Sequence, residues 1–459
     1  MISTNRNLWI VLSVALAAIV VGLVFVRSEA PTEPQEVSQA DAPSGMPPGH
    51  PTVTRPEDSA PPAASGSVAA VDPDAHFTHF RVGQRNVKTI LPDGDIIWVG
   101  TSAGVIRYDT SNDDYRLLDT RTGLLANGVF HLGKMNERLS VGTYGGGLSI
   151  LNETEDGWKT YNIPDGLGDG FIYDALELDN GDVWIATWSG ANRVRGGDLD
   201  DRGSWDLYTV ANTDGALPND WVYALHAGKN GEVWFATEGG LARFQNEAWQ
   251  NWTHAEGLGA DYETVREQIE FDMDPGEYSK HHARQKVEMG LEAIDVAYNP
   301  NYIVALEVDN DGAVWCGTWG GGLSRFNGES WKTYTVADGL PGNHVFMLHV
   351  DPEGDLWIGT SNGLARFDDG AFTRYTTEHG LFSNQIFSMA TADDGSKWVG
   401  SFGGVGGRAR LGLGAWLAPA GAVYWGEECC GRAAVWRGGS TWPQAGRAVP
   451  ATPDVMAGE

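Results

Sequence analysis

Short runs that alternate apolar and polar residues recur along most of the chain. The run HVFMLHVD at 344–351 is followed by a Glu-Gly pair, the Trp-containing run LWIGT and the run GLARF, and a last run, AFTRYTT, is rich in aromatic residues. Alternation with a period of two predicts β-strands, and glycine-containing pairs between such runs predict tight hairpins. Each unit therefore predicts four short antiparallel strands.

The Trp-containing run repeats along the sequence, with Ser140 at the Trp position of the second copy. Seven segments align at positions 98, 140, 184, 234, 315, 357 and 398, which are separated by 42, 44, 50, 81, 42 and 41 residues. Four strands in about 42 residues is the period of a β-propeller blade, in which each sheet covers its neighbour. The repeat therefore predicts an all-β fold, a seven-bladed β-propeller.

The ends of this propeller are predicted to join. The aromatic outer strand also occurs seven times, and its first copy, at 76–80, precedes the first Trp-containing run. We expect this copy to complete the last blade, because that pairing removes the open sheet edges. The propeller then covers residues 76–413.

The long step of 81 residues contains an insertion at about 258–298. This segment is charged and poor in glycine, and its apolar positions have helical spacing on both sides of Pro275. It predicts one or two helices that form a lid or a partner-docking element, or an inert elaboration of the blade. His281 and His282 lie in it, and we expect them to be solvated rather than metal-binding, because adjacent histidines point apart on a helix.

The amino-terminal region predicts a membrane anchor. Residues Leu8–Val26 carry no charge and are long enough to span a bilayer, which favours an uncleaved transmembrane helix within 1–30 over a cleaved signal peptide. A proline-rich stretch at 31–75 predicts a disordered linker. We expect a single-pass protein of the inner (cytoplasmic) membrane, with the propeller in the periplasm or outside the cell.

The carboxyl-terminal segment 414–459 differs from the rest of the chain. It has no repeat and no alternation, and it is rich in Gly, Ala, Arg and Trp. It predicts an irregular tail, or the product of a shifted reading frame.

The repeats resemble the two-component-regulator propeller family. The segment DGLPGNHVFMLHVDPEGDLWIGTSNGLARF at 338–367 matches the family pattern most fully, and the resemblance covers roughly 77–413. It implies an extracytoplasmic ligand-sensing propeller, of the kind often joined to histidine kinases and associated with polysaccharides. The sequence contains no second span and no kinase or receiver domain, so we expect a binding platform without signalling enzyme activity.

The amino-acid composition disfavours several classes of partner and cofactor. Lys and Arg number 31 and Asp and Glu 61, for a net charge of −30, which disfavours nucleic acid. The three cysteines have no zinc or haem spacing, and we expect no cofactor and no metal. Catalytic motifs are missing as well, so no catalytic residue is predicted.

Candidate ligand-binding residues come from the loops of one propeller face. Aromatic residues follow the Thr or Ser of four Trp-containing runs, and asparagines recur in four connections between blades: Tyr144, Trp188, Trp319, Phe402, Asn127, Asn219, Asn343 and Asn384. The aromatics predict exposed flat surfaces around the channel mouth, unless each packs on its own turn. The asparagines either bind ligand or bond their own backbone.

Three functions remain open at this point. The first is a non-catalytic binding propeller that recognises a saccharide or an envelope protein. The alternatives are a polysaccharide lyase or hydrolase with a propeller fold, and a structural scaffold of an envelope complex.

Overall fold

Every Trp-containing run forms the second strand of an antiparallel sheet in the computed structural model. The structure describes residues 70–71, 77–269, 287, 296–368 and 370–408, all within one compact unit, Gly45–Glu459. In this part of the chain no helix combines the length and the apolar character that a bilayer crossing requires. The predicted span Leu8–Val26, most of the linker and the tail 414–459 lie outside the described residues.

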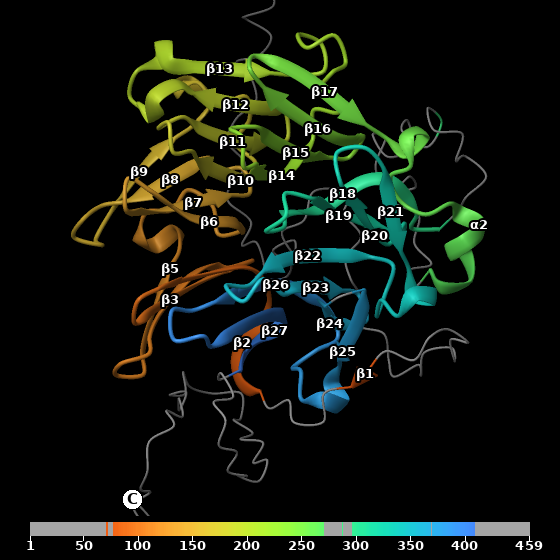
Figure 1. The fold of residues 1–459 in the computed structure, drawn as a ribbon. Helices are drawn as coiled ribbons and strands as arrows, with labels where there is room; N and C mark the ends of the chain where they lie inside the picture. Colours follow the sequence, from red (N-terminus) through yellow and green to blue (C-terminus); the bar gives the residue numbers. More distant parts are fainter. Residues whose placement is uncertain (1–69, 72–76, 270–286, 288–295, 369, 409–459) are drawn as a thin grey trace, which may run out of the picture. The chain divides into compact units, whose positions relative to one another are not determined.

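Four of the sheets contain four consecutive strands each (Figure 1). They comprise β6 (Val129–Met135), β7 (Arg138–Thr143), β8 (Leu148–Leu151) and β9 (Trp158–Tyr161); β10 (Ile172–Glu177), β11 (Val183–Thr187), β12 (Gly190–Val194) and β13 (Trp205–Tyr208); β14 (Val222–Ala227), β15 (Val233–Thr237), β16 (Gly240–Gln245) and β17 (Ala248–Trp252); and β18 (Asn299–Val308), β19 (Val314–Trp319), β20 (Leu323–Phe326) and β21 (Trp331–Tyr334). A fifth sheet contains β22 (Val345–Val350), β23 (Leu356–Thr360), β24 (Gly363–Asp368) and β25 (Ala371–Tyr375), with β1 (Ala70–Val71) added at its edge.

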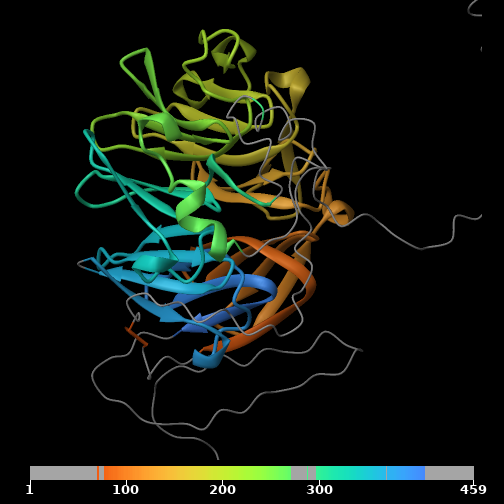
Figure 2. The same cartoon turned by 90° about the vertical axis from the view of Figure 1, so that its right-hand side faces the viewer.

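The sixth sheet joins the two ends of the repeat region. It has the order β26 (Ile386–Thr391), β27 (Lys397–Arg408), β2 (Thr78–Asp93), β3 (Ile96–Thr101), β4 (Gly104–Asp109) and β5 (Asp114–Leu118). The first part of β2, Thr78–Arg81, pairs antiparallel with β27, and the second part pairs with β3. In Figures 1 and 2 the orange β2 accordingly lies beside the blue β27. The predicted pairing of the first aromatic strand with the last Trp-containing run is confirmed.

The innermost strands contact one another in a closed series. Contacts run from β2 to β6, β10, β14, β18, β22 and β26, and from β26 back to β2. The fold is therefore all-β and propeller-like, as the repeat predicts. The core lies between adjacent sheets: Trp184 of β11, for example, packs with Val222 and Phe235 of the next sheet.

The repeated motif residues have local structural roles. The Thr or Ser at the end of each Trp-containing run donates its hydroxyl to a glycine carbonyl across the following turn, as Thr237 does to Gly240 at 2.7 Å. For four of the motif Trp residues an Arg of the following strand stacks on the ring, as Arg243 does on Trp234 at 5.5 Å. These contacts hold the hairpin of each sheet in register.

Five of the connections between sheets contain short 3-10 helices with a common capping pattern. They are η1 (Thr120–Thr122), η2 (Ile163–Asp165), η5 (His254–Glu256), η7 (Val336–Asp338) and η8 (Thr377–His379), and η3 (Arg195–Gly197) and η4 (Arg202–Ser204) lie between β12 and β13. In η7 the Thr335 hydroxyl and the Asp338 carboxylate form a capping box, and Gly339 ends the helix with a φ of 106°. The next residue, Leu340, is fully buried in the core. In the Asp-Gly-Leu pattern of the sequence, Asp caps the short helix, Gly ends it and Leu is buried in the core.

Two segments differ from their sequence interpretation. Ala70–Val71, assigned to the disordered linker, pairs in parallel with β25, because the outer edge of that sheet offers unpaired backbone groups. The insertion is helical at its start, in α2 (Tyr262–Val265) and η6 (Arg266–Gln268), and β18 begins at Asn299, earlier than the alternation at Ile303 indicates. Residues 270–286 and 288–295, including His281 and His282, lie outside the described residues.

Candidate functional site

Each innermost strand carries a β-bulge where it pairs with the Trp-containing strand. In five inner pairs the register shifts at the second apolar residue of a dipeptide such as Val-Phe or Ile-Tyr, and in β2 and β18 it shifts after Val87 and Ile303. A bulge adds one residue to one strand and redirects its side chain. The residues at the bulged positions are Lys88, Phe130, Tyr173, Tyr223, Val304, Phe346 and Phe387.

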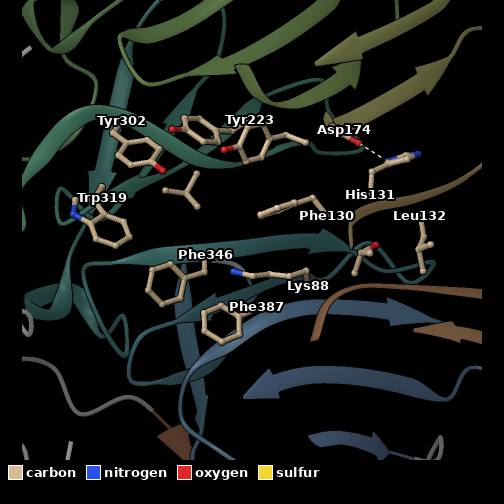
Figure 3. A pocket seen from close by; sticks show the side chains of 13 residues that line it. Lys88, Phe130, His131, Leu132, Asp174, Tyr223, Tyr302, Trp319, Phe346 and Phe387 are labelled. Atoms are coloured by element: carbon tan, nitrogen blue, oxygen red, sulfur yellow. Dashed lines mark hydrogen bonds and ion pairs between the residues drawn. The ribbon is translucent and has the colours of Figure 1, made fainter. Parts of the chain in front are cut away.

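All of these bulged side chains line one cavity of about 350 Å³ between the inner strands (Figure 3). Tyr302 of β18 and Trp319 of β19 also line it. This site is not predicted from the sequence, although two consecutive apolar residues that interrupt a strand's alternation are a recognisable bulge signal. The cavity lies where the inner strands converge, so no single repeat contains it.

Aromatic side chains follow one another around the cavity. Successive ring centroids are 5.0 Å apart for Phe130 and Tyr173, 4.8 Å for Tyr173 and Tyr223, 4.8 Å for Tyr223 and Tyr302, 5.7 Å for Tyr302 and Trp319, 6.0 Å for Trp319 and Phe346, and 5.5 Å for Phe346 and Phe387. Distances of this size are typical of favourable aromatic pairs. The wall presents flat apolar surfaces that suit a ring-shaped ligand.

Lys88 lies between Phe387 and Phe130, the two ends of this aromatic series. Its ammonium nitrogen lies 4.8 Å from the centroid of Phe387 and 5.8 Å from that of Phe130. Burial lowers the pKa of Lys88 from 10.5 to about 8. Among the described residues Lys88 makes no hydrogen bond or ion pair. The cavity therefore contains one cation held against aromatic faces.

The tyrosines give the cavity polar groups as well. The Tyr223 hydroxyl donates to the buried Glu238 carboxylate at 3.2 Å. Burial raises the pKa of Tyr173, Tyr223 and Tyr302 well above the ordinary value of 10.0. These hydroxyls therefore stay protonated at neutral pH and can act as donors.

A Ser-His-Asp contact lies at one side of the cavity. His131 Nδ1 is 2.9 Å from Asp174 Oδ1, and His131 Nε2 is 3.2 Å from Ser140 Oγ. Asp174 Oδ2 also accepts the backbone N–H of Leu225 at 2.8 Å. Ser140 is fully buried, so its hydroxyl cannot reach a substrate in the cavity. The arrangement ties β6, β7, β10 and β14 together rather than exposing a nucleophile.

The four predicted aromatic residues fall in three environments. Trp319 lines the cavity and is 7% exposed. Tyr144 and Trp188 are half-buried and pack on Phe171, at 4.4 and 4.9 Å. Phe402 is 42% exposed. Of the four, only Phe402 presents the exposed surface that the sequence predicts, because the other rings pack against neighbouring aromatic side chains.

The four predicted asparagines bond backbone groups of their own connections. Asn127, Asn343 and Asn384 each accept, through Oδ1, the first backbone N–H of the preceding 3-10 helix, from Thr120, Val336 and Thr377. Asn219 accepts the N–H of Trp221 at 2.8 Å. These contacts fit the turn role that the sequence left open, and the ligand-binding role of the asparagines stays a prediction.

Aspartates in the acidic turns accept hydrogen bonds from N–H groups of the same hairpin. In the turn at 309–312, Asp309 Oδ1 accepts the N–H of Asp311, and Oδ2 accepts the indole N–H of Trp315 at 2.8 Å. Within the described ranges no three His, Cys, Asp or Glu side chains are grouped to hold a metal ion.

Three segments of the chain, 216–239, 297–320 and 339–362, match the model of the two component regulator propeller family. These three segments are two-component-regulator propeller repeats. Each matched segment contains one inner strand with its bulge, together with the following Trp-containing run. A search of curated proteins gives no significant match.

Solved structures share the fold of these propeller repeats. The extracellular domains of the two component systems BT3049 and BT4673 from B. thetaiotaomicron align with TM-scores of 0.55 and 0.53, at 19% and 17% identity, over 72% of this chain. The alignment covers 39% of each of those chains, so this chain spans about two fifths of their length. Virginiamycin B lyase from Staphylococcus aureus, solved with quinupristin, aligns with a TM-score of 0.52 at 13% identity, over 74% of this chain and 100% of that chain. At these identities the likeness shows the fold alone.

Proposed function

We propose that this protein is a non-catalytic binding propeller of seven blades that holds a ring-shaped ligand, such as a saccharide, in its central cavity. The observation that carries the proposal is the continuous wall of aromatic side chains around a cavity of about 350 Å³. Binding pockets for small molecules have this size and this mixture of aromatic surface with few polar groups. The closed series of inner strands from β2 to β26 supports the blade count.

The location is part of the same proposal. The uncharged segment Leu8–Val26 supports tethering to the inner membrane, with the propeller on the outer side. Removal of residues 1–30 should release the protein from the membrane fraction into the soluble one, which fractionation of cells that express both forms measures. Equal membrane retention of both forms would contradict the anchor.

Ligand binding can be tested on the full-length protein in detergent. We expect a panel of neutral and acidic oligosaccharides to contain at least one that quenches or enhances tryptophan fluorescence in a saturable way. Phe387→Ala should weaken that binding at least tenfold, because the ring forms part of the cavity wall. Tyr115→Ala is the matched control, since Tyr115 is 40% exposed on the outer strand β5.

An envelope protein is the alternative occupant of the same face. In that case no oligosaccharide binds, and crosslinking in cells captures a protein partner. Phe402→Ala should lower the yield of the crosslinked complex, because the Phe402 side chain is exposed. Saturable saccharide binding that Phe402→Ala leaves unchanged would favour the cavity.

A second candidate function is a lyase or hydrolase that acts on polysaccharide. The His131–Asp174 pair in the cavity wall favours it, because a histidine held by a carboxylate is a common general base. The test is incubation of the full-length protein with acidic and neutral polysaccharides, with measurement of new reducing ends. Turnover that His131→Ala abolishes and Tyr115→Ala preserves would replace the non-catalytic proposal.

A further inference from the structure

The bulged position of the inner strands is occupied by apolar residues except in β2. Five strands place Phe or Tyr there and β18 places Val304, whereas β2 places Lys88. These positions are structurally equivalent, and an aromatic or aliphatic residue would complete the wall. A lysine at such a position loses hydration, which the downward shift of its pKa to about 8 reflects.

The carboxylates of this region are engaged elsewhere. Asp174 accepts from His131 and from the backbone N–H of Leu225. Glu238 accepts from the hydroxyl of Tyr223. The contacts of Lys88 found within the described ranges are the faces of Phe130 and Phe387. Figure 3 shows its amine between the side chains of Phe346 and Phe387 on one side and Phe130 on the other.

A cation in this environment favours an anionic ligand. The attraction between opposite charges is stronger in a site shielded from water than at the surface, and a bound anion offsets the lost hydration of the amine. The net charge of −30 opposes an acidic ligand only weakly, because charges beyond about 10 Å are screened at physiological salt. Aromatic faces beside the cation add contact area for the ring that carries the acidic group.

We infer that the ligand of the cavity is a ring compound with one acidic group, such as a uronate, and that Lys88 binds this group while the aromatic wall holds the ring. The inference rests on the proposed binding function and specifies its ligand class. Lys88 then decides between acidic and neutral forms of the same ring, and the aromatic residues supply affinity for both.

A matched ligand pair tests this assignment on the full-length protein. The probes are galacturonic acid and its methyl ester, which have the same ring and differ in charge. We expect wild type to bind the acid at least tenfold more tightly than the ester at pH 7. Lys88→Met should remove this preference and leave the dissociation constant of the ester within about twofold. Lys88→Arg should keep the preference, because arginine stays charged.

The pH dependence gives a second readout. Affinity for the acid should fall as the pH rises above about 8 in wild type, since the free amine loses its charge there. The other titratable groups of the cavity wall are His131, Asp174 and the three tyrosines, and all of them remain in Lys88→Arg. A fall in affinity that is absent in Lys88→Arg therefore belongs to Lys88.

The outcomes are distinguishable. Equal binding of acid and ester by wild type, or a preference that persists in Lys88→Met, overturns the role of Lys88 and leaves the binding function intact. Failure of both probes to bind contradicts the proposed saccharide function, and the inference fails with it. Thermal unfolding of each variant shows whether a loss of binding comes from loss of the fold.

Discussion

The ammonium nitrogen of Lys88 lies 4.8 Å from the centroid of the Phe387 ring, and the two residues belong to the first and the last inner strand of the fold. One residue earlier and one residue later along the same strands, the backbone carbonyl of Val87 accepts the hydroxyl of Ser388 at 3.1 Å. The proposed ligand site therefore includes the junction where the two ends of the repeat region meet. Closure of the fold and formation of the site depend on the same contacts.

Phe80 should be important for this closure. It lies in the part of β2 that pairs with β27, and its ring stacks on Trp398 at 5.4 Å and contacts Tyr108 at 5.5 Å. Phe80→Ala should lower the free energy of unfolding by about 2–3 kcal/mol, as expected for loss of a largely buried aromatic ring. Urea unfolding measures the change. Tyr115→Ala, on an exposed side chain, should change it by less than about 0.5 kcal/mol, and equal effects of both variants would contradict the role of Phe80.

Gly166 should be intolerant of any side chain. Its φ is 138°, and an added Cβ would lie 2.6 Å from the Trp205 ring. Gly328 is the matched control, because its φ of 96° is also left-handed but nothing lies within 4 Å of an added Cβ. Gly328→Ala should cost about 1–2 kcal/mol for backbone strain alone, and Gly166→Ala about 1–3 kcal/mol more for the clash. Similar losses for both variants in urea unfolding would show that Trp205 moves aside.

Cys316 should be chemically silent in the folded protein. The thiol is fully buried in β19, and burial raises its pKa. Because the thiolate is the reactive form, a maleimide should label Cys316 only after unfolding. The measurement uses a variant in which Cys429 and Cys430 are replaced by serine, and mass spectrometry follows labelling against urea concentration. Rapid labelling without urea would mean that the sheets containing β14 and β18, between which Cys316 is buried, separate readily.

Two histidines should contribute oppositely to the pH dependence of stability. Burial lowers the pKa of His344 to about 4, so the unfolded chain binds a proton more readily than the folded one. The contribution of His344 to folding stability is therefore present above about pH 6.5 and is lost as the pH falls to about 4. For His226, burial lowers the pKa, but the Glu307 carboxylate 2.6 Å away, the Ala227 carbonyl and Asp174 together raise it by more, and the net shift is upward. Its contribution is present below about pH 6.5 and is lost as the pH rises through the folded pKa.

Urea unfolding between pH 4 and pH 8 checks both signs. The stability advantage of wild type over His344→Gln should shrink by up to roughly 3 kcal/mol toward pH 4. The advantage over His226→Gln should shrink toward pH 8. Parallel pH profiles for both variants would contradict the assigned charge states.

Much of the fold was accessible from local patterns. The alternating runs, the glycine turns and the motif tryptophans each reflect interactions within one sheet or with its neighbour, as the Arg243–Trp234 stack and the Thr237 turn illustrate. The pairing of Thr78–Arg81 with β27 was predictable as well, because an incomplete last repeat leaves one open place for an unpaired strand. Residues 70–71 were not predictable in this way, since pairing at an outer edge requires no pattern in the added strand.

The candidate site was less accessible. Trp319 was identified from its turn, but its burial in the cavity depends on Tyr302, which a long bulge in β18 brings beside it. Lys88 carried no signal, because one lysine in an alternating strand is usually a solvent-facing residue. Its position becomes informative only beside the equivalent bulged residues of the other inner strands.

The sequence by itself determined the strand pattern, the repeat period and the order of the sheets, because these follow from turn chemistry and from the burial of residues close together along the chain. The tertiary structure alone decided which side chains converge at the centre. That convergence sets residues of all the inner strands, from Lys88 to Phe387, around one cavity, and it depends on bulges and on the closing of the series rather than on any local sequence preference.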